Sequence, residues 1–587
     1  MINPNEQNEH FRFGSARLGE VRDALAAGLL GDKKGAPIYG FLGGYALSIA
    51  SDSPVLTCAG SGAGKLRDVL AGLVCTYPGN MLILDLKGEI AAISQVALIQ
   101  QGARPKAGYY INAFGLNGLP AHRFNPLDIL TANSITLHQD AKVIAESLIQ
   151  TSGGGNSDYF EGRARELVEK GAKYRVIKYG GTTLPELYRM LCTIDSQPET
   201  WQLIAEDMMR CGLGDVRAVA GEMLHKQKDA PGEFSAIMGT LHKNLNFVTD
   251  PAIERTLSGG DFSLEVFADP ALRANVYIMV PAQYVGALSS FLRLTFAVAA
   301  TVKQRSPDAP TLYLLCDESS QLGHFEALER CVTYGRGAVR THTVWQDLGQ
   351  ITRHYGPSGL QTFLGSSQVR QFFGIRDIQS ATIISQMLGT QTLEFDDPLQ
   401  QAGAQKKQRH ALFDLLTGEV DPFMAAADVM HFAQAAHHRT KQARQLRTPS
   451  EVMALAENLQ YLFISGVGCP PLEAERRSYI TRPDLAGRYL SNPYHEQGFV
   501  QVATRWGQRR ARVITAEVPR CLEYLPQYAG RSWQYVEGYK PDLRHLQALE
   551  RRMDRGMEQV RQAAKRLEHQ PGRGAGAVRL LEYKQED

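Results

Sequence analysis

The sequence predicts an α/β protein with a mostly parallel sheet, interrupted by an all-helical domain. Two observations support this prediction. A glycine-rich loop at 60–64 follows a short apolar run at 53–58 and precedes a helical pattern, and a second apolar run at 311–316 ends in adjacent carboxylates. Short apolar runs that alternate with helical patterns are typical of βαβ units, whose strands are buried on both faces. Between the two runs lies a long segment with helical periodicity.

The composition is that of a globular protein with several domains. The chain has 587 residues, of which 44% are hydrophobic and 21% charged, and this length predicts roughly two to four domains. A net charge of +2 gives no overall field that would attract a polyanion. The eight cysteines are scattered without a C-x-x-C pair, which favours reduced thiols over disulfides or a zinc site.

The sequence shows no membrane or export signal. Its first residues are polar, and no stretch reaches the roughly 18 apolar residues that a membrane helix needs. We therefore expect a cytoplasmic protein without a spanning helix of its own.

Residues 55–70, VLTCAGSGAGKLRDVL, resemble the phosphate-binding pattern G-x-x-x-x-G-K-[ST]. The apolar run MLILDL follows at 81–86, so the loop occupies a strand-to-helix turn of a βαβ unit. Successive amides of such a loop curl around an anion, and Lys65 reaches the terminal phosphates. A glycine-rich turn without a ligand is the alternative for the loop alone. The predicted nucleotide-binding residues are Gly60, Ser61, Gly62, Ala63, Gly64, Lys65 and Leu66.

Two positions of this loop depart from the pattern. Ala59 replaces the first glycine, which is a mild change because that position mainly shapes the turn. Leu66 replaces the hydroxyl that normally ligates Mg²⁺, which is more serious.

The apolar run TLYLLCDE at 311–318 predicts a Walker B strand. Asp317 would hold Mg²⁺ through water, and Glu318 would activate the attacking water. A strand that runs out into solvent is the alternative, but the phosphate loop favours the metal site. The separation between Lys65 and Asp317 is far longer than a few βαβ units of about 30 residues require, so a large insertion is expected.

Helical patterns fill most of this separation, and an apolar strand run returns at 275–281. We therefore predict an N-terminal segment over 1–50, the first part of the nucleotide-binding domain over 51–134, an all-α domain over 135–265, the second part of the nucleotide-binding domain over 266–495 and a basic C-terminal extension over 496–587.

A second insertion is predicted at 395–446, which is rich in Gln, Ala and His. Its histidines lack the spacing of metal ligands, so a solvated helical insertion is favoured over a metal site. They are His431, His437 and His438.

The C-terminal extension is predicted to be mainly helical, and it contains two patterns. Residues 501–518 alternate like a strand pair, and an amphipathic helix is expected from 543. Basic residues outnumber acidic ones over 501–587. The tail either binds nucleic acid or a partner helix, or packs on its own motor domain with a solvated arginine face, and the sequence leaves these alternatives open.

A series of short phrases between residues 13 and 493 occurs in a fixed order. They are FGSARLGEV (13–21), LDLKGEI (84–90), HRFNPLDIL (122–130), DYFEGRARELV (158–168), TLSGGDFSL (256–264), DESSQLGHFEALERCVTYGRG (317–337), VWQDLGQI (344–351) and RTPSEVMAL (447–455). In this order they resemble the type IV secretion coupling proteins, the TraG/TraD-like ATPases of bacterial conjugation. Each phrase alone is weakly specific, whereas the series is highly specific.

The resemblance implies a RecA-like domain that carries an all-helical domain, with ATP and Mg²⁺ as cofactors. It also implies a homohexamer with a central channel for single-stranded DNA and nucleotides between neighbouring subunits. By position, Arg336 resembles the arginine offered to the next subunit's nucleotide, and Gln346 the polar sensor of the γ-phosphate. Without the resemblance they would be a solvated arginine and a strand-end glutamine.

The partners implied are a relaxase on single-stranded DNA and the secretion-channel ATPases or inner-membrane components. The family typically begins with two membrane helices, whereas the motor here begins almost at once. We therefore expect attachment at the cytoplasmic face of the bacterial inner membrane only through a partner.

The leading prediction is a coupling protein that uses DNA-stimulated ATP hydrolysis to drive DNA, protein substrates or both into a type IV secretion channel. One alternative is a cytosolic DNA translocase of the FtsK/HerA type, favoured by the missing membrane helices. A second is a degenerate motor that serves as a recruitment platform, favoured by Ala59 and Leu66.

Overall fold

The computed structural model describes residues 13–555, apart from 34, 101–104, 152–154, 418–420, 437–438, 496, 549 and 552–554. Most of the helix expected from 543 lies outside these residues. None of the described helices combines the length and the apolar character of a membrane span.

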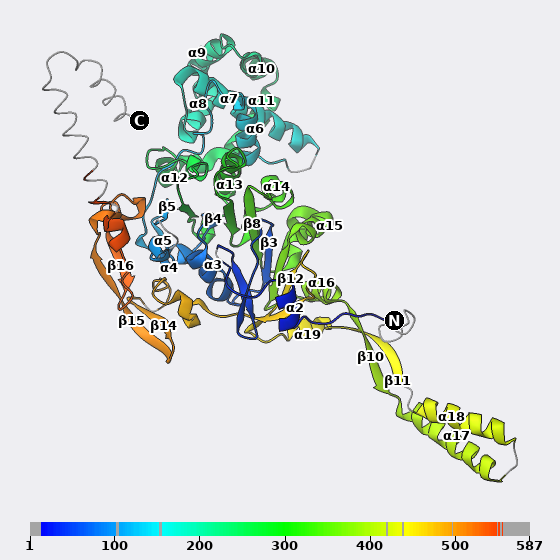
Figure 1. Ribbon diagram of the computed structural model, residues 1–587. Coiled ribbons are helices and arrows are strands. Elements are labelled where there is room, and N and C mark those ends of the chain that lie inside the picture. The colour runs from blue at the N-terminus through cyan, green and yellow to red at the C-terminus, as the bar shows by residue number, and fades with distance from the viewer. Residues whose placement is uncertain are drawn as a thin grey trace, which may run out of the picture.

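One large sheet forms the body of the protein (Figure 1). It has 11 strands in the order β2-β1-β13-β12-β9-β3-β8-β7-β4-β6-β5. The strands from β9 to β5 run parallel, which confirms the predicted α/β class with a mostly parallel sheet. These strands are β3 (Val55–Ala59), β4 (Asn80–Leu84), β5 (Ala107–Ile111), β6 (Ala274–Ile278), β7 (Leu312–Cys316), β8 (Val339–Trp345) and β9 (Val369–Phe373).

The other half of the sheet is antiparallel and was not predicted. Four strands continue from β9 with alternating direction, so that segments from both ends of the chain lie together. They are β1 (Ile38–Leu42), β2 (Tyr45–Ser48), β12 (Leu459–Ile464) and β13 (Leu472–Glu475).

Helices cover both faces of the parallel half. Every residue of β3, β4, β6 and β7 is buried, as expected for strands packed between two helical layers. The helices of this domain are α2 (Val21–Ala26), α3 (Ala71–Thr76), α4 (Glu89–Ile93), α5 (Ala97–Gln100), α13 (Ser289–Gln304), α14 (Glu326–Tyr334), α15 (Leu348–Ser366), α16 (Ile378–Leu388) and α19 (Pro449–Met453).

A helical domain separates β5 from β6 and stands above the sheet in Figure 1. A single hydrophobic cluster runs from the sheet, for example Leu84, into this domain, for example Leu167. The domain is therefore packed on the sheet. Its helices are α6 (Leu137–Leu148), α7 (Asn156–Tyr179), α8 (Leu184–Ser196), α9 (Pro198–Met209), α10 (Gly214–Asp229), α11 (Pro231–Leu245) and α12 (Pro251–Thr256).

The second insertion is an arm that projects from the body (Figure 1). Strands β10 (Thr390–Asp396) and β11 (Arg439–Gln445) form an antiparallel ribbon, and α17 (Pro398–Thr417) and α18 (Pro422–Ala436) form a hairpin at its end. The sequence predicted helices here but not the ribbon. No cluster of three metal-ligating side chains occurs in the described part of the chain, and His437 and His438 of this insertion lie outside it.

The described part of the C-terminal extension is largely a sheet. The predicted strand pair is present as β14 (Phe499–Thr504) and β15 (Gly507–Glu517), and β16 (Ser532–Val536) adds a third strand. The side chain of Gln527 accepts a hydrogen bond from the Gly108 amide at 2.7 Å and donates one to the Lys106 carbonyl at 3.0 Å. The extension is thereby attached to the β5 edge of the main sheet.

A row of buried polar side chains crosses the middle of the main sheet. Tyr313 of β7 bonds His342 of β8, which bonds Thr57 of β3 at 2.8 Å. Thr57 donates to the Gln371 side chain of β9 at 3.0 Å, and Gln371 donates to that of Gln460 on β12 at 2.9 Å. This row links the parallel half to the antiparallel half.

Candidate active site

The glycine-rich loop follows β3 and leads into a short π-helix, Lys65–Leu70. Gly62 and Gly64 have φ values of 71° and 84°, which glycine adopts without steric cost. A Cβ atom on Gly60 would lie 2.3 Å from the Gly374 carbonyl oxygen, so this position also requires glycine. Ala59 is the buried last residue of β3 and precedes the turn, which is why the first glycine of the pattern is dispensable here.

Three of the predicted site residues meet at the carboxyl ends of β3, β7 and β8. Lys65 Nζ lies 3.1 Å from Glu318 Oε1, and Gln346 Nε2 donates to Glu318 Oε2 at 2.8 Å. Because these strands are parallel neighbours, their carboxyl ends share one edge of the sheet. The site therefore brings a lysine, a carboxylate and an amide together beside the loop.

Glu318 occupies a strained backbone conformation. Its φ of 58° and ψ of 52° are left-handed, a region that costs a non-glycine residue about 1–3 kcal/mol and is enriched at functional sites. The contacts with Lys65 and Gln346 hold the carboxylate in place from both sides.

The neighbouring Asp317 fits a hydrated divalent cation. Burial, followed by the charge of Glu318, raises the pKa of its carboxyl to about 6. Its Oδ1 atom is buried and has no hydrogen-bond partner among the described residues. An orphaned carboxylate oxygen beside a phosphate loop is suited to Mg²⁺, which prefers oxygen ligands and keeps several waters.

Leu66 contributes no ligand to such an ion. Its side chain is half-buried and packs against two apolar clusters, one beneath the loop and one around Ala71 and Tyr489. Leu66 thus contributes apolar packing at the position where the pattern places a metal-ligating hydroxyl.

Arg336 lies away from the other site residues of its own chain. It precedes β8, whereas Gln346 follows β8, so the strand of about 23 Å separates them. Its side chain is 75% exposed and Nε lies 3.2 Å from Asp52 Oδ1. Within one chain it does not reach the loop.

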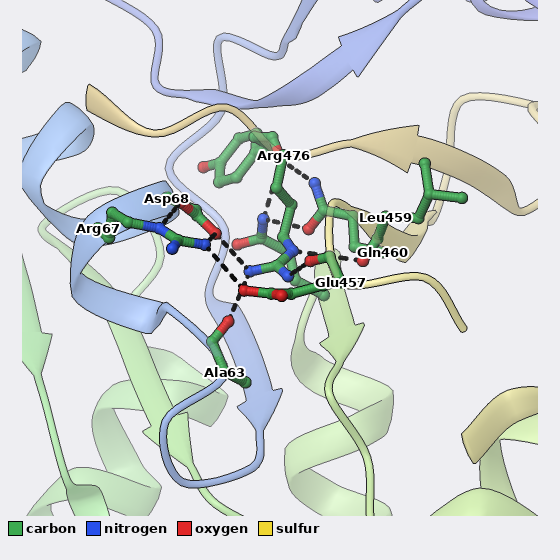
Figure 2. A network of polar contacts seen from close by, with 9 residues as sticks. Ala63, Arg67, Asp68, Glu457, Leu459, Gln460 and Arg476 are labelled. Atoms are coloured by element: carbon green, nitrogen blue, oxygen red, sulfur yellow. Dashed lines mark hydrogen bonds and ion pairs between the residues drawn. The ribbon is translucent and has the colours of Figure 1, made fainter. Parts of the chain in front are cut away.

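A buried arginine that was not predicted supports the loop from outside (Figure 2). Arg476, directly after β13, is 1% exposed and donates to the Ala63 carbonyl at 2.8 Å and to Asp68 Oδ2 at 2.9 Å. The same guanidinium donates to the carbonyls of Glu457 and Leu459 and stacks on Phe373, 3.9 Å from the ring centroid.

This arrangement fixes the orientation of the loop backbone. When the amides of an anion-binding loop point inward, its carbonyls point outward and need donors. Arg476 supplies that donor to Ala63, and Asp68 balances its charge. No local sequence signal marks this pair, because its members are 408 positions apart.

Comparison with known proteins identifies the family of the chain. Residues 22–411 match the family described as type IV secretory system conjugative DNA transfer. The protein VirD4 of Rhizobium radiobacter is 25% identical over 410 residues, which cover 67% of this chain and 57% of that protein. The type IV secretion system-coupling protein VirD4 of Bartonella quintana is 23% identical over 459 residues, covering 75% and 64% respectively.

Solved structures show the same fold. The plasmid coupling protein TrwB in complex with the ATP analogue ADPNP matches with a TM-score of 0.54 at 16% identity, over 79% of this chain and 93% of that one. The chain spans less than two thirds of the length of the VirD4 proteins it matches. The family match covers well over half of the sequence, and the chain belongs to the type IV secretory system conjugative DNA transfer family.

Proposed function

We propose that this protein is an ATP-hydrolysing coupling protein that moves DNA, protein substrates or both towards a type IV secretion channel. The observation that supports it most directly is the meeting of Lys65, Glu318 and Gln346 beside the phosphate loop. Family membership gives this nucleotide site its context, since relatives carry the name of secretion system-coupling proteins. TrwB, which shares the fold, has been solved with ADP and Mg²⁺ and with ADPNP.

Each residue has a distinct role in the proposed hydrolysis. The loop amides and Lys65 hold the phosphates, and Asp317 holds a hydrated Mg²⁺, which neutralises phosphate charge. Glu318 orients the attacking water, and Gln346 contacts the γ-phosphate. In the structure Lys65 donates to Glu318. When phosphate binds, Lys65 contacts the phosphate in place of Glu318, and the carboxylate is then free to bind water.

Arg336 acts on a neighbouring subunit in this proposal. Its exposed side chain lies before the amino end of β8, whereas the loop of its own chain lies at the carboxyl ends of the parallel strands. A ring of subunits, the proposed hexamer, would place it against the next subunit's nucleotide, where it stabilises charge that develops during transfer. Single-stranded DNA with its relaxase, and the channel ATPases or inner-membrane components, are the proposed partners.

The test is steady-state ATP hydrolysis with and without single-stranded DNA. Wild type is compared with Lys65→Ala and Glu318→Gln. The matched control is Glu326→Gln, whose exposed carboxylate bonds Arg330 within α14. We expect DNA-stimulated turnover in wild type and control, and a loss of about 10²–10⁴-fold in Glu318→Gln.

A recruitment platform without turnover is the second candidate, and Leu66 is the observation that favours it. It would be supported by wild-type activity equal to that of Lys65→Ala in a sample shown to be hexameric on DNA. That result would contradict the proposed hydrolysis.

A further inference from the structure

The β14–β15 hairpin of the C-terminal extension carries a strongly basic surface. Residues 497–516 contain four arginines and no acidic residue, in a chain whose net charge is only +2. All four arginines are exposed, and Arg505, Arg509 and Arg512 pair with no carboxylate in the part of the chain that the structure describes. Exposed cations of this density attract a polyanion. The hairpin lies beyond residues 22–411 that match the family, so family membership assigns it no role.

Cross-strand pairing places two of these arginines on the outer face of the hairpin. The inner face packs in a buried cluster through Val500. Side chains alternate along a strand, so the neighbouring pairs, Phe499 with Arg512 and Gln501 with Arg510, point away from that cluster. Together with the turn, the outer face consists of Phe499, Gln501, Arg505, Trp506, Arg510 and Arg512.

Aromatic rings lie between the arginines of this outer face. The Arg510 guanidinium lies 4.0 Å from the centroid of the Phe499 ring, and the Arg505 guanidinium lies 4.6 Å from that of Trp506. Trp506 is 84% exposed at the turn of the hairpin. Rings that lie next to guanidiniums offer stacking and positive charge to the same ligand.

This combination of groups favours a single strand over other polyanions. A duplex keeps its bases inside the helix, where an exposed ring cannot stack on them. A membrane-binding surface has a continuous apolar face with its basic residues on another face, whereas rings and charges alternate here. A single strand presents phosphates and accessible bases together, and it therefore needs cations and rings side by side.

We propose that the outer face of the β14–β15 hairpin binds single-stranded DNA. Arg505, Arg510 and Arg512 contact phosphates, and the Trp506 ring stacks on a base. The inference rests on the proposed function, which supplies DNA as the substrate, and adds a contact surface that this function does not locate. The outer face contains no residue of the nucleotide site, so it holds the strand whether or not ATP is bound.

The first experiment removes the stacking ring. Binding of labelled oligothymidylate to the full chain is measured by fluorescence anisotropy, without nucleotide and at several salt concentrations. Stacking of one base on an aromatic side chain changes affinity about tenfold or more, so we expect the dissociation constant of Trp506→Ala to rise about tenfold with the same salt dependence. The matched control is Tyr45→Ala, because Tyr45 is an exposed aromatic in β2. Its dissociation constant should equal that of wild type.

The second experiment removes phosphate contacts. Each phosphate contact with a single strand contributes about 0.7 to the slope of log affinity against log salt, so Arg510→Gln with Arg512→Gln should lower that slope by about 1.4. The matched control is Arg520→Gln with Arg544→Gln, which removes the same charge from two exposed arginines that already pair with carboxylates. Equal changes in the two double variants would show that only overall charge matters and would overturn the outer face as a site.

The outcomes separate this surface from the proposed function. DNA-stimulated ATP hydrolysis in a wild type whose DNA affinity is unchanged by the outer-face variants, or does not exist without nucleotide, would overturn the surface alone. DNA binding through the outer face without ATP hydrolysis would overturn the proposed function alone. Duplex DNA or oligouridylate bound more tightly than oligothymidylate would overturn the assignment to single-stranded DNA. Anionic vesicles that lose affinity in Trp506→Ala, while oligothymidylate does not, would assign the surface to a membrane instead.

Discussion

The two halves of the main sheet serve the same site in different ways. In the parallel half, Lys65, Glu318 and Gln346 follow β3, β7 and β8, and the lysine and the amide both contact the Glu318 carboxylate. In the antiparallel half, Arg476 directly follows β13 and donates a hydrogen bond to the outer surface of the loop. The first half supplies groups that are placed for chemistry, and the second supplies a rigid support for the backbone. Motifs reveal the first role, whereas the second becomes visible only in the folded chain.

The largest effect on stability is expected when the support is removed. Arg476→Gln leaves the buried Asp68 with Arg67 as its remaining cation and leaves the Ala63 carbonyl without its donor. Each buried polar group that loses its partner costs about 1–3 kcal/mol, and more where a charge is involved. Urea unfolding measures the loss. Arg477→Gln is the matched control, because Arg477 is half-exposed and pairs with Glu475 at the surface, so its change should stay within about 0.5 kcal/mol. Equal losses in the two variants would show that the antiparallel half gives the loop no special support.

A smaller effect on the free energy of unfolding is expected when the pH is changed, because the buried polar row that joins the two halves contains a histidine. Burial, followed by the charge of Arg340, lowers the pKa of His342 to about 3 from 6.5. Between about pH 3 and pH 6.5, this histidine is therefore protonated in the unfolded chain but not in the folded chain. The free energy of unfolding then falls as pH falls, by up to about 1.4 kcal/mol per pH unit.

Urea unfolding between pH 6.5 and 4 measures this effect. We expect a steeper dependence on pH in wild type than in His342→Gln, which keeps an amide in the row but cannot titrate. Parallel curves for the two proteins would contradict the prediction.

The smallest effect is expected at the loop itself. Leu66→Thr removes apolar contacts of a half-buried side chain, so we expect a loss of about 1 kcal/mol and reduced ATP turnover. Thermal unfolding and ATP hydrolysis are measured beside Leu25→Thr, an exposed leucine in α2. A gain in turnover would show that the missing hydroxyl limits the wild-type site and would favour the recruitment platform.

The sequence predicted the parts of the site that are local in the chain. The loop, the strand that ends in Asp317 and Glu318, and the helical insertion each have a pattern within a few dozen residues. The α/β class follows from the same patterns, because buried parallel strands appear as apolar runs. The roles of the individual site residues remain predictions that the experiments above address.

The rest depends on contacts between distant segments. Arg476 and Asp68 are ordinary charged residues until β13 is placed beside the loop, and the strands of the antiparallel half are short and separated by most of the chain. The ribbon of the arm and the third strand of the C-terminal sheet carry no distinctive alternation. Only their pairing partners reveal them, across a helical hairpin for the ribbon and across residues 518–531 for the third strand.

The buried polar row has a consequence for how the chain selects its native sheet. Successive residues of a strand face opposite sides, so a shift of one residue in β8 would turn His342 away from Thr57 and Tyr313. Each buried polar group left without a partner costs about 1–3 kcal/mol. A sheet with a shifted strand would therefore lose several buried hydrogen bonds at once. In a sheet with a purely apolar interior, the same shift would cost less free energy. The row therefore makes the native strand pairing more stable than pairings shifted by one residue. This matters in a sheet whose strands come from many segments between Ile38 and Glu475.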